Sequence, residues 1–178
     1  MTEALADPKT LNILETIKGR SYPSKDVKVW LDQETIHAIA ELENEIAVET
    51  DGERVNELDE QIHTLREKVE KTALTFHLRG IDRRTRRQAI KRVENLVKKG
   101  EIEDLDAQVV LTDQFLAAHL IRVTDADGGA QEKLWTAEDA SDILDMLPEQ
   151  GTKALIDAMD ELTFKAARFD AEVTPDFS

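Results

Sequence analysis

Apolar and polar residues alternate along two short stretches of this chain, residues 27–31 and 74–79. The apolar positions are Val27, Val29, Leu31, Leu74, Phe76 and Leu78, and the residues between them are polar apart from Trp30. A period of two residues is typical of a strand with one buried face. The sequence therefore predicts one strand in each stretch.

Between these two stretches the apolar period lengthens to that of a helix. Residues 36–47 carry a broad apolar stripe, and residues 55–72 carry a seam with the heptad spacing 3, 4, 3, 4, 3, formed by Val55, Leu58, Ile62, Leu65, Val69 and Thr72. The sequence Thr50-Asp51-Gly52 supplies a turn between them. We therefore expect an antiparallel helical hairpin over residues 33–72. A hairpin returns the chain to its starting level, so the two strands can pair antiparallel at its base.

Capping residues indicate where helices begin and end, both in the hairpin and after the second strand. Asp32 and Asp82 stand where a carboxylate can accept the free N–H groups of a first helical turn, and Gly100 is a favoured left-handed end of a helix. Thr112 and Thr136 are candidate starts of later helices, with residues 125–129 as a loop between them. A last amphipathic stripe covers residues 155–166.

The predicted fold class is mainly α with a small β component (α+β). A short two-stranded antiparallel sheet flanks the helical hairpin, and a basic helix and a C-terminal helical bundle follow. The expected boundaries are a flexible N-terminal segment at 1–26, the strand–hairpin–strand unit at 27–81, the basic helix at 82–100, the C-terminal helical region at 101–170 and a flexible tail at 171–178.

Composition narrows the functional classes. The chain has 178 residues, no cysteine and only 4% aromatic residues. The lack of cysteine excludes disulfides and thiolate metal sites and suits a reducing cytoplasm. No apolar run approaches the roughly 20 residues of a membrane span, and the N-terminus has no signal-peptide pattern. We expect no membrane association and no large enzyme core.

Charge is distributed unevenly along the chain. The formal net charge is −15. Residues 41–70 hold eleven acidic and three basic groups, and residues 101–178 hold nineteen acidic and five basic groups. Residues 79–99 hold nine basic and two acidic groups, so this segment alone carries +7. Such asymmetry indicates electrostatic partners inside or outside the molecule.

No arrangement of residues in the sequence points to catalysis. All seven glycines stand at turns or helix ends, so no phosphate-binding loop is formed. His37 and His63 could face each other across the hairpin, but HxxxH spacing and an intervening carboxylate are missing. The calcium-loop-like Asp125-Ala-Asp127-Gly lacks its glutamate, because that position is Thr136. We expect no enzyme activity, no cofactor and no metal.

The basic helix has two interpretations. Its first turn is cationic nearly all round, from Arg83, Arg84, Arg86 and Arg87. This density is typical of a nucleic-acid footprint. However, cations at a helix N-terminus oppose the helix dipole, the rest of the chain carries −22, and no aromatic residue interleaves to stack on bases. These observations argue against nucleic-acid binding. We expect these arginines to pair with acidic helices of this chain, of a second copy or of a protein partner.

The order of elements provides a family resemblance. The stretches that carry it are VKVWLD, ALTFHLRGIDRRTRRQAI, LTDQFLAAHLIRV and WTAEDASDILDMLPEQGTKALIDAMDEL, within roughly residues 27–165. Together they resemble the tail assembly chaperones of long-tailed (siphovirus-type) phages that infect actinobacteria. In that family a strand ending in Leu-Asp opens a hairpin, a TFxxR strand leads into a charged helix, and an LAA segment precedes a helix that starts with T-x-E-D. The matching positions are Leu31, Asp32, Thr75, Phe76, Arg79, Ala117, Ala118, Thr136, Glu138 and Asp139.

The resemblance implies a role in tail morphogenesis. Family members bind the long, helical, aggregation-prone tape measure protein and keep it soluble before the major tail protein polymerises around it. They act in the host cytoplasm during infection and are not expected in the mature virion. The candidate partners are therefore the tape measure protein, a longer frameshifted form of this chain, the major tail protein and further copies of the chain.

Candidate client contacts lie on the last helix and the basic helix. We expect an apolar C-terminal surface formed by Leu162, Phe164 and Phe169, with the arginine-rich helix steering or docking the client. The alternative is that the two phenylalanines cover the base of their own domain. The sequence also allows two other functions. One is a structural virion subunit of the tail or connector, and the other is a small nucleic-acid-binding regulator that uses the arginine-rich helix.

Overall fold

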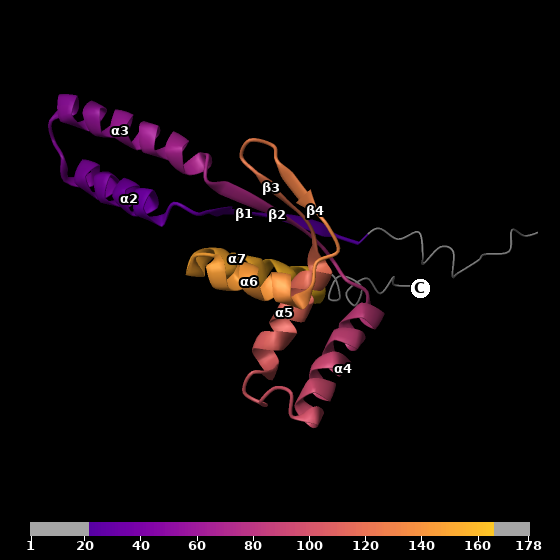
Figure 1. Cartoon of the computed structure of the whole chain (residues 1–178). Helices are drawn as coiled ribbons and strands as arrows, with labels where there is room; N and C mark the ends of the chain where they lie inside the picture. Colours follow the sequence, from indigo (N-terminus) through magenta and orange to yellow (C-terminus); the bar gives the residue numbers. More distant parts are fainter. Residues whose placement is uncertain (1–21, 166–178) are drawn as a thin grey trace, which may run out of the picture.

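The computed structural model describes residues 22–165, and the strands within this range form one antiparallel sheet (Figure 1). The strands are β1 (Ser24–Trp30), β2 (Ala73–Arg79), β3 (Leu120–Asp125) and β4 (Ala130–Glu132), in the order β1-β2-β3-β4. Val27 lies opposite Phe76, and Phe76 lies opposite Val123. This register places the apolar residues of three strands on one face of the sheet.

The predicted hairpin connects β1 to β2. Its helices are α2 (Gln33–Val48) and α3 (Gly52–Glu70), and they project away from the sheet (Figure 1). Asp32 caps α2 by accepting a hydrogen bond from the Thr35 backbone N–H at 3.0 Å, and Asp51 caps α3 in a similar way. Hydrogen bonds from Thr35 and the Lys68 ammonium lower the pKa of Asp32 to about 2. The hairpin and its first cap are thus confirmed.

Four longer helices and one short π-helical turn follow the hairpin unit. They are α4 (Arg83–Lys99), α5 (Ala107–His119), α6 (Ala137–Met146), α7 (Glu149–Asp160) and η1 (Glu161–Lys165). Asp82 caps α4, and Gly100 ends it at a φ of 70°, as predicted. Thr136 and Asp139 form a reciprocal capping box at the start of α6.

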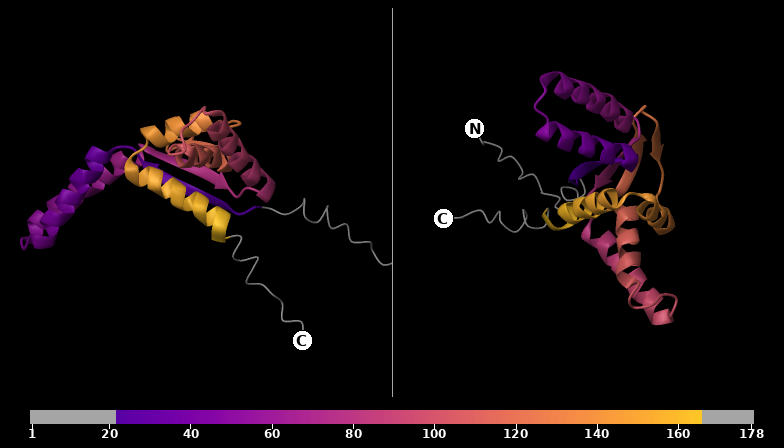
Figure 2. Two further views of the ribbon diagram at one scale, coloured as in Figure 1. Left: turned by 90° about the horizontal axis from the view of Figure 1, so that it is seen from below. Right: turned by 90° about the vertical axis from the view of Figure 1, so that its left-hand side faces the viewer.

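The core lies between the apolar face of the sheet and the C-terminal helices. The most deeply buried side chains are Leu78, Leu116, Leu155, His119 and Phe76, together with Leu58 inside the hairpin. Helix α7 runs alongside β1 (Figure 2), and α5 packs on both α6 and α7. The opposite face of the sheet is polar: on it, His77 Nδ1 lies 2.8 Å from Asp26 and His77 Nε2 lies 3.1 Å from Thr124.

The structure confirms the mainly α (α+β) class and corrects several details. The sheet has four strands, because β3 and β4 lie in the region 101–170 that we expected to be helical. Leu120–Asp125 is rich in β-branched residues, and Asp127-Gly128, with a φ of 87° at Gly128, forms the turn into β4. Helix α5 begins at Ala107 rather than at Thr112, whose hydroxyl bonds the Gln108 carbonyl oxygen within the helix.

Two boundaries also differ from the prediction. Strand β1 begins at Ser24, inside the segment 1–26 that we expected to be flexible, and Leu31 lies beyond its end with 42% exposure. The Leu31 side chain therefore does not continue the buried face of the strand. The expectations for residues 1–21 and for the tail at 171–178 lie outside the described residues.

Candidate interaction surfaces

Helix α4 presents its cations to solvent. Its buried residues, Ala89 and Val93, lie on one face, and α4 packs against α5. On the opposite face Arg83, Arg84, Arg87, Gln88 and Lys91 line an open groove of about 400 Å³. We call this the cationic groove. Its walls combine aliphatic stems with guanidinium and ammonium groups.

The cations of this groove, Arg83, Arg84, Arg87 and Lys91, form no ion pair within the part of the chain that the structure describes. The Lys99–Glu101 pair of α4 lies at the other end of the helix. Hydrogen bonds from Thr85 lower the pKa of the capping carboxylate of Asp82, and the Arg84 guanidinium helps to lower it further. The acidic hairpin lies on the other side of the molecule from α4 (Figure 1). We expected the arginines of this helix to pair with acidic helices of this chain, of a second copy or of a protein partner. Arg83, Arg84 and Arg87 form no ion pair within the described residues, whereas Arg86, which does not line the groove, already has a partner. For the three arginines of the groove, a second copy and a protein partner remain.

The hairpin uses its own cations internally. Arg54 contacts Glu45 at 3.1 Å and Glu57 at 3.0 Å, and Arg66 contacts Glu43 at 2.7 Å. Lys68, the remaining cation of α3, lies 3.2 Å from the capping carboxylate of Asp32. Because eleven acidic groups stand against three basic ones in residues 41–70, the hairpin keeps a strong negative excess after these pairs have formed.

The apolar stripe of the hairpin is only partly covered. Leu58, Ile62 and Val69 of α3 are buried, whereas the large apolar residues of α2 are half-buried or exposed. The groove between the helices has a volume of about 400 Å³ and is lined by Glu43, Ile46, Asp59, Ile62, His63 and Arg66. We call this the hairpin groove. It has an apolar floor with a charged rim, because two helices can cover each other on one side only.

The predicted C-terminal client surface is not formed as expected. Leu162 has only 7% exposure and belongs to the core cluster with Leu155 and Met159. It lies on the buried stripe of the last helical segment, so the prediction that Leu162 contacts a client is wrong for this structure. The backbone of Phe164 belongs to η1, but its side chain and all of Phe169 lie outside the described residues. For these two phenylalanines the interpretation stays a prediction.

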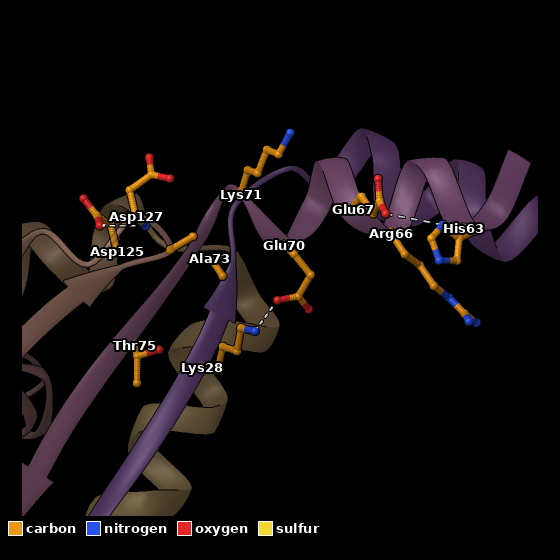
Figure 3. A pocket seen from close by; sticks show the side chains of 11 residues that line it. Lys28, His63, Arg66, Glu67, Glu70, Lys71, Ala73, Thr75, Asp125 and Asp127 are labelled. Atoms are coloured by element: carbon orange, nitrogen blue, oxygen red, sulfur yellow. Dashed lines mark hydrogen bonds and ion pairs between the residues drawn. The ribbon is translucent and has the colours of Figure 1, made fainter.

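A third hollow lies on the polar face of the sheet. It has a volume of about 600 Å³ and is bordered by the end of α3, β1, β2 and the β3–β4 turn (Figure 3). Several of its charged groups have partners: Lys28 contacts Glu70, and His63 lies 3.6 Å from Glu67. Asp125 accepts the backbone N–H groups of Asp127 and Gly129. Lys71 and Asp127 also line the hollow and form no ion pair within residues 22–165.

The two histidines and the acidic turn that the sequence offers as candidate metal sites make other contacts in the structure. His37 and His63 each contact a glutamate four residues further along their own helix. Among residues 22–165, no group of three or more histidine, aspartate or glutamate side chains is arranged to hold a metal ion. Asp125 is occupied by its own turn, in agreement with the interpretation of residues 125–129 as an acidic loop.

Two buried titratable groups were not predicted from the sequence. Burial raises the pKa of Asp113, which faces Ser141 and Asp145, and the neighbouring Asp145 carboxylate raises it further. Burial also lowers the pKa of His119, whose Nδ1 lies 2.7 Å from the Phe115 carbonyl oxygen. The spacing of the two residues could have indicated their burial. Asp113 and His119 each stand three residues from Leu116, and His119 stands four residues from Phe115, so both share the apolar side of α5.

Comparison with protein-family models, curated proteins and solved structures finds no match for this chain. Within the described residues, the helices fall short of the length and apolar character needed to cross a membrane. The function must therefore be argued from the surfaces above. They are one cationic groove, one acidic hairpin whose groove has an apolar floor, and a polar hollow in which several of the charged groups are paired.

Proposed function

We propose that this chain is a phage tail assembly chaperone that binds the helical tape measure protein and keeps it soluble during tail morphogenesis. The support from sequence is the resemblance described above, which includes Leu31 and Asp32 at the hairpin entry and Thr136 and Asp139 at a helix start. The support from geometry is the hairpin groove. No group arranged for catalysis competes with this interpretation in the described part of the chain.

The partly covered hairpin carries the proposal. An isolated pair of helices buries less apolar surface than a bundle, and an amphipathic client helix laid into the groove would cover Ile46 and complete a three-helix layer. Binding is favourable for the client because it removes the apolar stripe of the client helix from water. This stripe is the surface that would otherwise aggregate. The carboxylates at the rim would keep the complex dispersed through like-charge repulsion.

A co-expression experiment tests this function. The chain is produced together with a candidate tape measure protein from the same genome, and the soluble fraction of that protein is measured after centrifugation. Ile46→Lys places a charge on the apolar floor, whereas Asn44→Lys adds the same residue on the opposite, exposed face of α2. We expect the wild type and Asn44→Lys to keep the client soluble and Ile46→Lys to fail.

Each outcome has a defined meaning. Circular dichroism must show that Ile46→Lys retains its helices, so that loss of rescue reports binding. A soluble client with folded Ile46→Lys would remove the hairpin groove from the client site. The double variant Phe164→Ser and Phe169→Ser would then test the C-terminal contact. Failure of the wild type to raise client solubility would refute the chaperone function.

A second candidate function rests on the cationic groove. A nucleic-acid-binding regulator would also present exposed arginines that form no ion pair within the described residues. Such a regulator would bind duplex DNA with an affinity that falls steeply as salt rises, and Arg84→Glu with Arg87→Glu would abolish that binding. A structural virion subunit, the remaining alternative, would be retained in purified particles and visible on a gel of virions.

A further inference from the structure

The chain carries two surfaces of opposite charge on elements that lie apart in the fold (Figure 1). The cationic groove lies on α4, and the acidic hairpin projects from the other end of the sheet (Figure 1). Neither surface can neutralise the other within one molecule. Every copy nevertheless carries both, so the complement of each surface is always present at equal concentration.

The cationic surface is one continuous helical face. Arg83, Arg87 and Lys91 follow one another at intervals of four residues, and Arg84 and Gln88 form the adjacent row. The buried residues Ala89 and Val93 lie on the opposite side and hold α4 against α5. The groove therefore stands on a packed helix and does not depend on a mobile loop.

The acidic surface is a matching row on α3. Glu53, Glu57 and Glu60 share the face of α3 that points away from Leu58 and Ile62. Glu53 and Glu60 form no ion pair with any residue in the range 22–165. Glu57, Glu60, Gln61, Thr64 and Leu65 line an open groove of about 480 Å³, which we call the acidic groove.

The two grooves fit in length and in chemistry. The lining residues lie within 83–91 on α4 and within 57–65 on α3, so at 1.5 Å per residue each groove follows roughly 12 Å of its helix. Half-buried Leu65 supplies an apolar patch on which arginine stems can lie while their guanidinium groups reach carboxylates. The acidic groove is also separate from the hairpin groove, because the latter uses Asp59, His63 and Arg66 on another side of α3.

We propose that the cationic groove of one copy docks on the acidic groove of a second copy of this chain. The contact is heterologous, because different patches meet, so each added copy leaves one free groove of each kind. The chain would then assemble head to tail. This proposal does not rest on the chaperone function, since it requires no client.

Salt should control this assembly. The contact consists mainly of exposed charges, and the Debye length falls from about 10 Å at 0.1 M salt to about 3 Å at 1 M. Each copy also carries a formal net charge of −15, which opposes approach at very low ionic strength. We expect the average mass in sedimentation velocity to rise with protein concentration near 0.1–0.15 M salt and to return to the monomer value at 1 M.

Paired charge reversals give the decisive test. The first variant carries Arg84→Glu and Arg87→Glu, and the second carries Glu53→Lys and Glu60→Lys. We expect each variant alone to be monomeric. In the first variant two new carboxylates stand against Arg83 and Lys91, so the α4 groove loses its net positive charge. In the second variant the two new ammonium groups outnumber the Glu57 carboxylate, so the α3 face becomes positive like the cationic groove. An equimolar mixture should associate again, because each variant carries the complement that the other needs. The control Lys98→Glu with Lys99→Glu makes the same charge change on α4 outside the groove and should assemble like the wild type.

The results separate the alternatives. A wild type that stays monomeric at all salt concentrations would overturn the proposal, as would reversal variants that assemble alone or fail to assemble when mixed. Loss of duplex DNA binding in the first variant, in a chain that never self-associates, would assign the groove to nucleic acid instead. Failure of client rescue with intact charge-reversal behaviour would refute the chaperone function and leave this proposal standing.

Discussion

Gly151 of α7 lies against Val29 of β1, and replacing it with alanine is a sharp test of the fold. An added Cβ at Gly151 would lie 2.4 Å from Val29 Cγ1 and 3.4 Å from Val29 Cγ2. Carbon atoms in contact normally stand about 3.5–4.0 Å apart. Val29 is 3% exposed and β-branched, so its side chain cannot swing away from the helix without leaving its preferred rotamer.

Two opposing terms decide the size of the effect. Alanine has a higher helix propensity than glycine, which favours the variant by about 1 kcal/mol. Overpacking a filled core costs about 1–3 kcal/mol, and here α7 must retreat by roughly 1 Å to restore a normal contact. That retreat would loosen the packing of Leu155 and Ala158, which are 0% and 1% exposed. We expect the steric term to prevail, with a net loss of about 1–2 kcal/mol in the free energy of unfolding.

Thermal unfolding followed by circular dichroism measures this loss. A decrease of about 1–2 kcal/mol corresponds to a melting temperature lowered by roughly 3–6 °C for a chain of this size. Gly52→Ala is the matched control, because an added Cβ there meets no atom within 4 Å and the position is also helical. The control should melt at or slightly above the wild-type temperature.

A double-mutant cycle identifies the cause. Val29→Ala alone removes two buried methyl groups and should cost about 2 kcal/mol. Combined with Gly151→Ala it also removes the atoms that clash, so the double variant should be more stable than the sum of the single effects by at least about 1 kcal/mol. A Gly151→Ala variant as stable as the wild type, or strictly additive effects, would show that α7 does not approach β1 in this way.

Two other variants test the hairpin and the buried carboxylate. Ile62→Asp places an unpaired charge at a 4% exposed position between α2 and α3 and should cost a few kcal/mol; unchanged ellipticity and melting would contradict the seam assignment. Asp113→Asn should raise the urea midpoint at pH 7, because the folded-state pKa of Asp113 is raised above its ordinary value of 3.8 and its ionised form costs stability. The gain should shrink as pH falls through the folded-state pKa and vanish below about 3.8, where both states are protonated; a gain that persists there would exclude the linkage.

The hairpin and helix α4 could be predicted from the sequence because the residues that determine them are close together in the chain. Heptad spacing, the caps at Asp32 and Asp82 and the left-handed end at Gly100 each depend on a few neighbouring residues. Strand β3 was missed for a different reason. It follows α5 without a break, and Leu120 ends the apolar run of the helix while also pairing with Leu78 in the sheet. The Asp127-Gly128 turn was the remaining local signal of a β-hairpin.

The candidate surfaces depend on longer-range geometry than local pattern can supply. The sequence shows that the segment 79–99 is basic and that 41–70 is acidic, but the sheet decides whether they meet. Because β1 and β2 are neighbours, the hairpin emerges from one end of this strand pair, whereas α4 begins after the opposite end of β2. The length of β1 and β2 thus separates the basic helix α4 from the acidic hairpin. Each charged surface is therefore available to a surface of opposite charge on another molecule.

Tertiary packing also decides which residues near the end of α7 are buried. Leu162, Phe164 and Phe169 all read as apolar positions near a helix end, and only the packing of α7 against the sheet places Leu162 in the core. A client surface chosen from apolar residues alone therefore selects core residues as readily as exposed ones. The better criterion is an apolar stripe that the fold leaves half covered. By that criterion α2 is the stronger candidate, because its large apolar residues are half-buried or exposed beside one neighbouring helix and Ile46 lines an open groove.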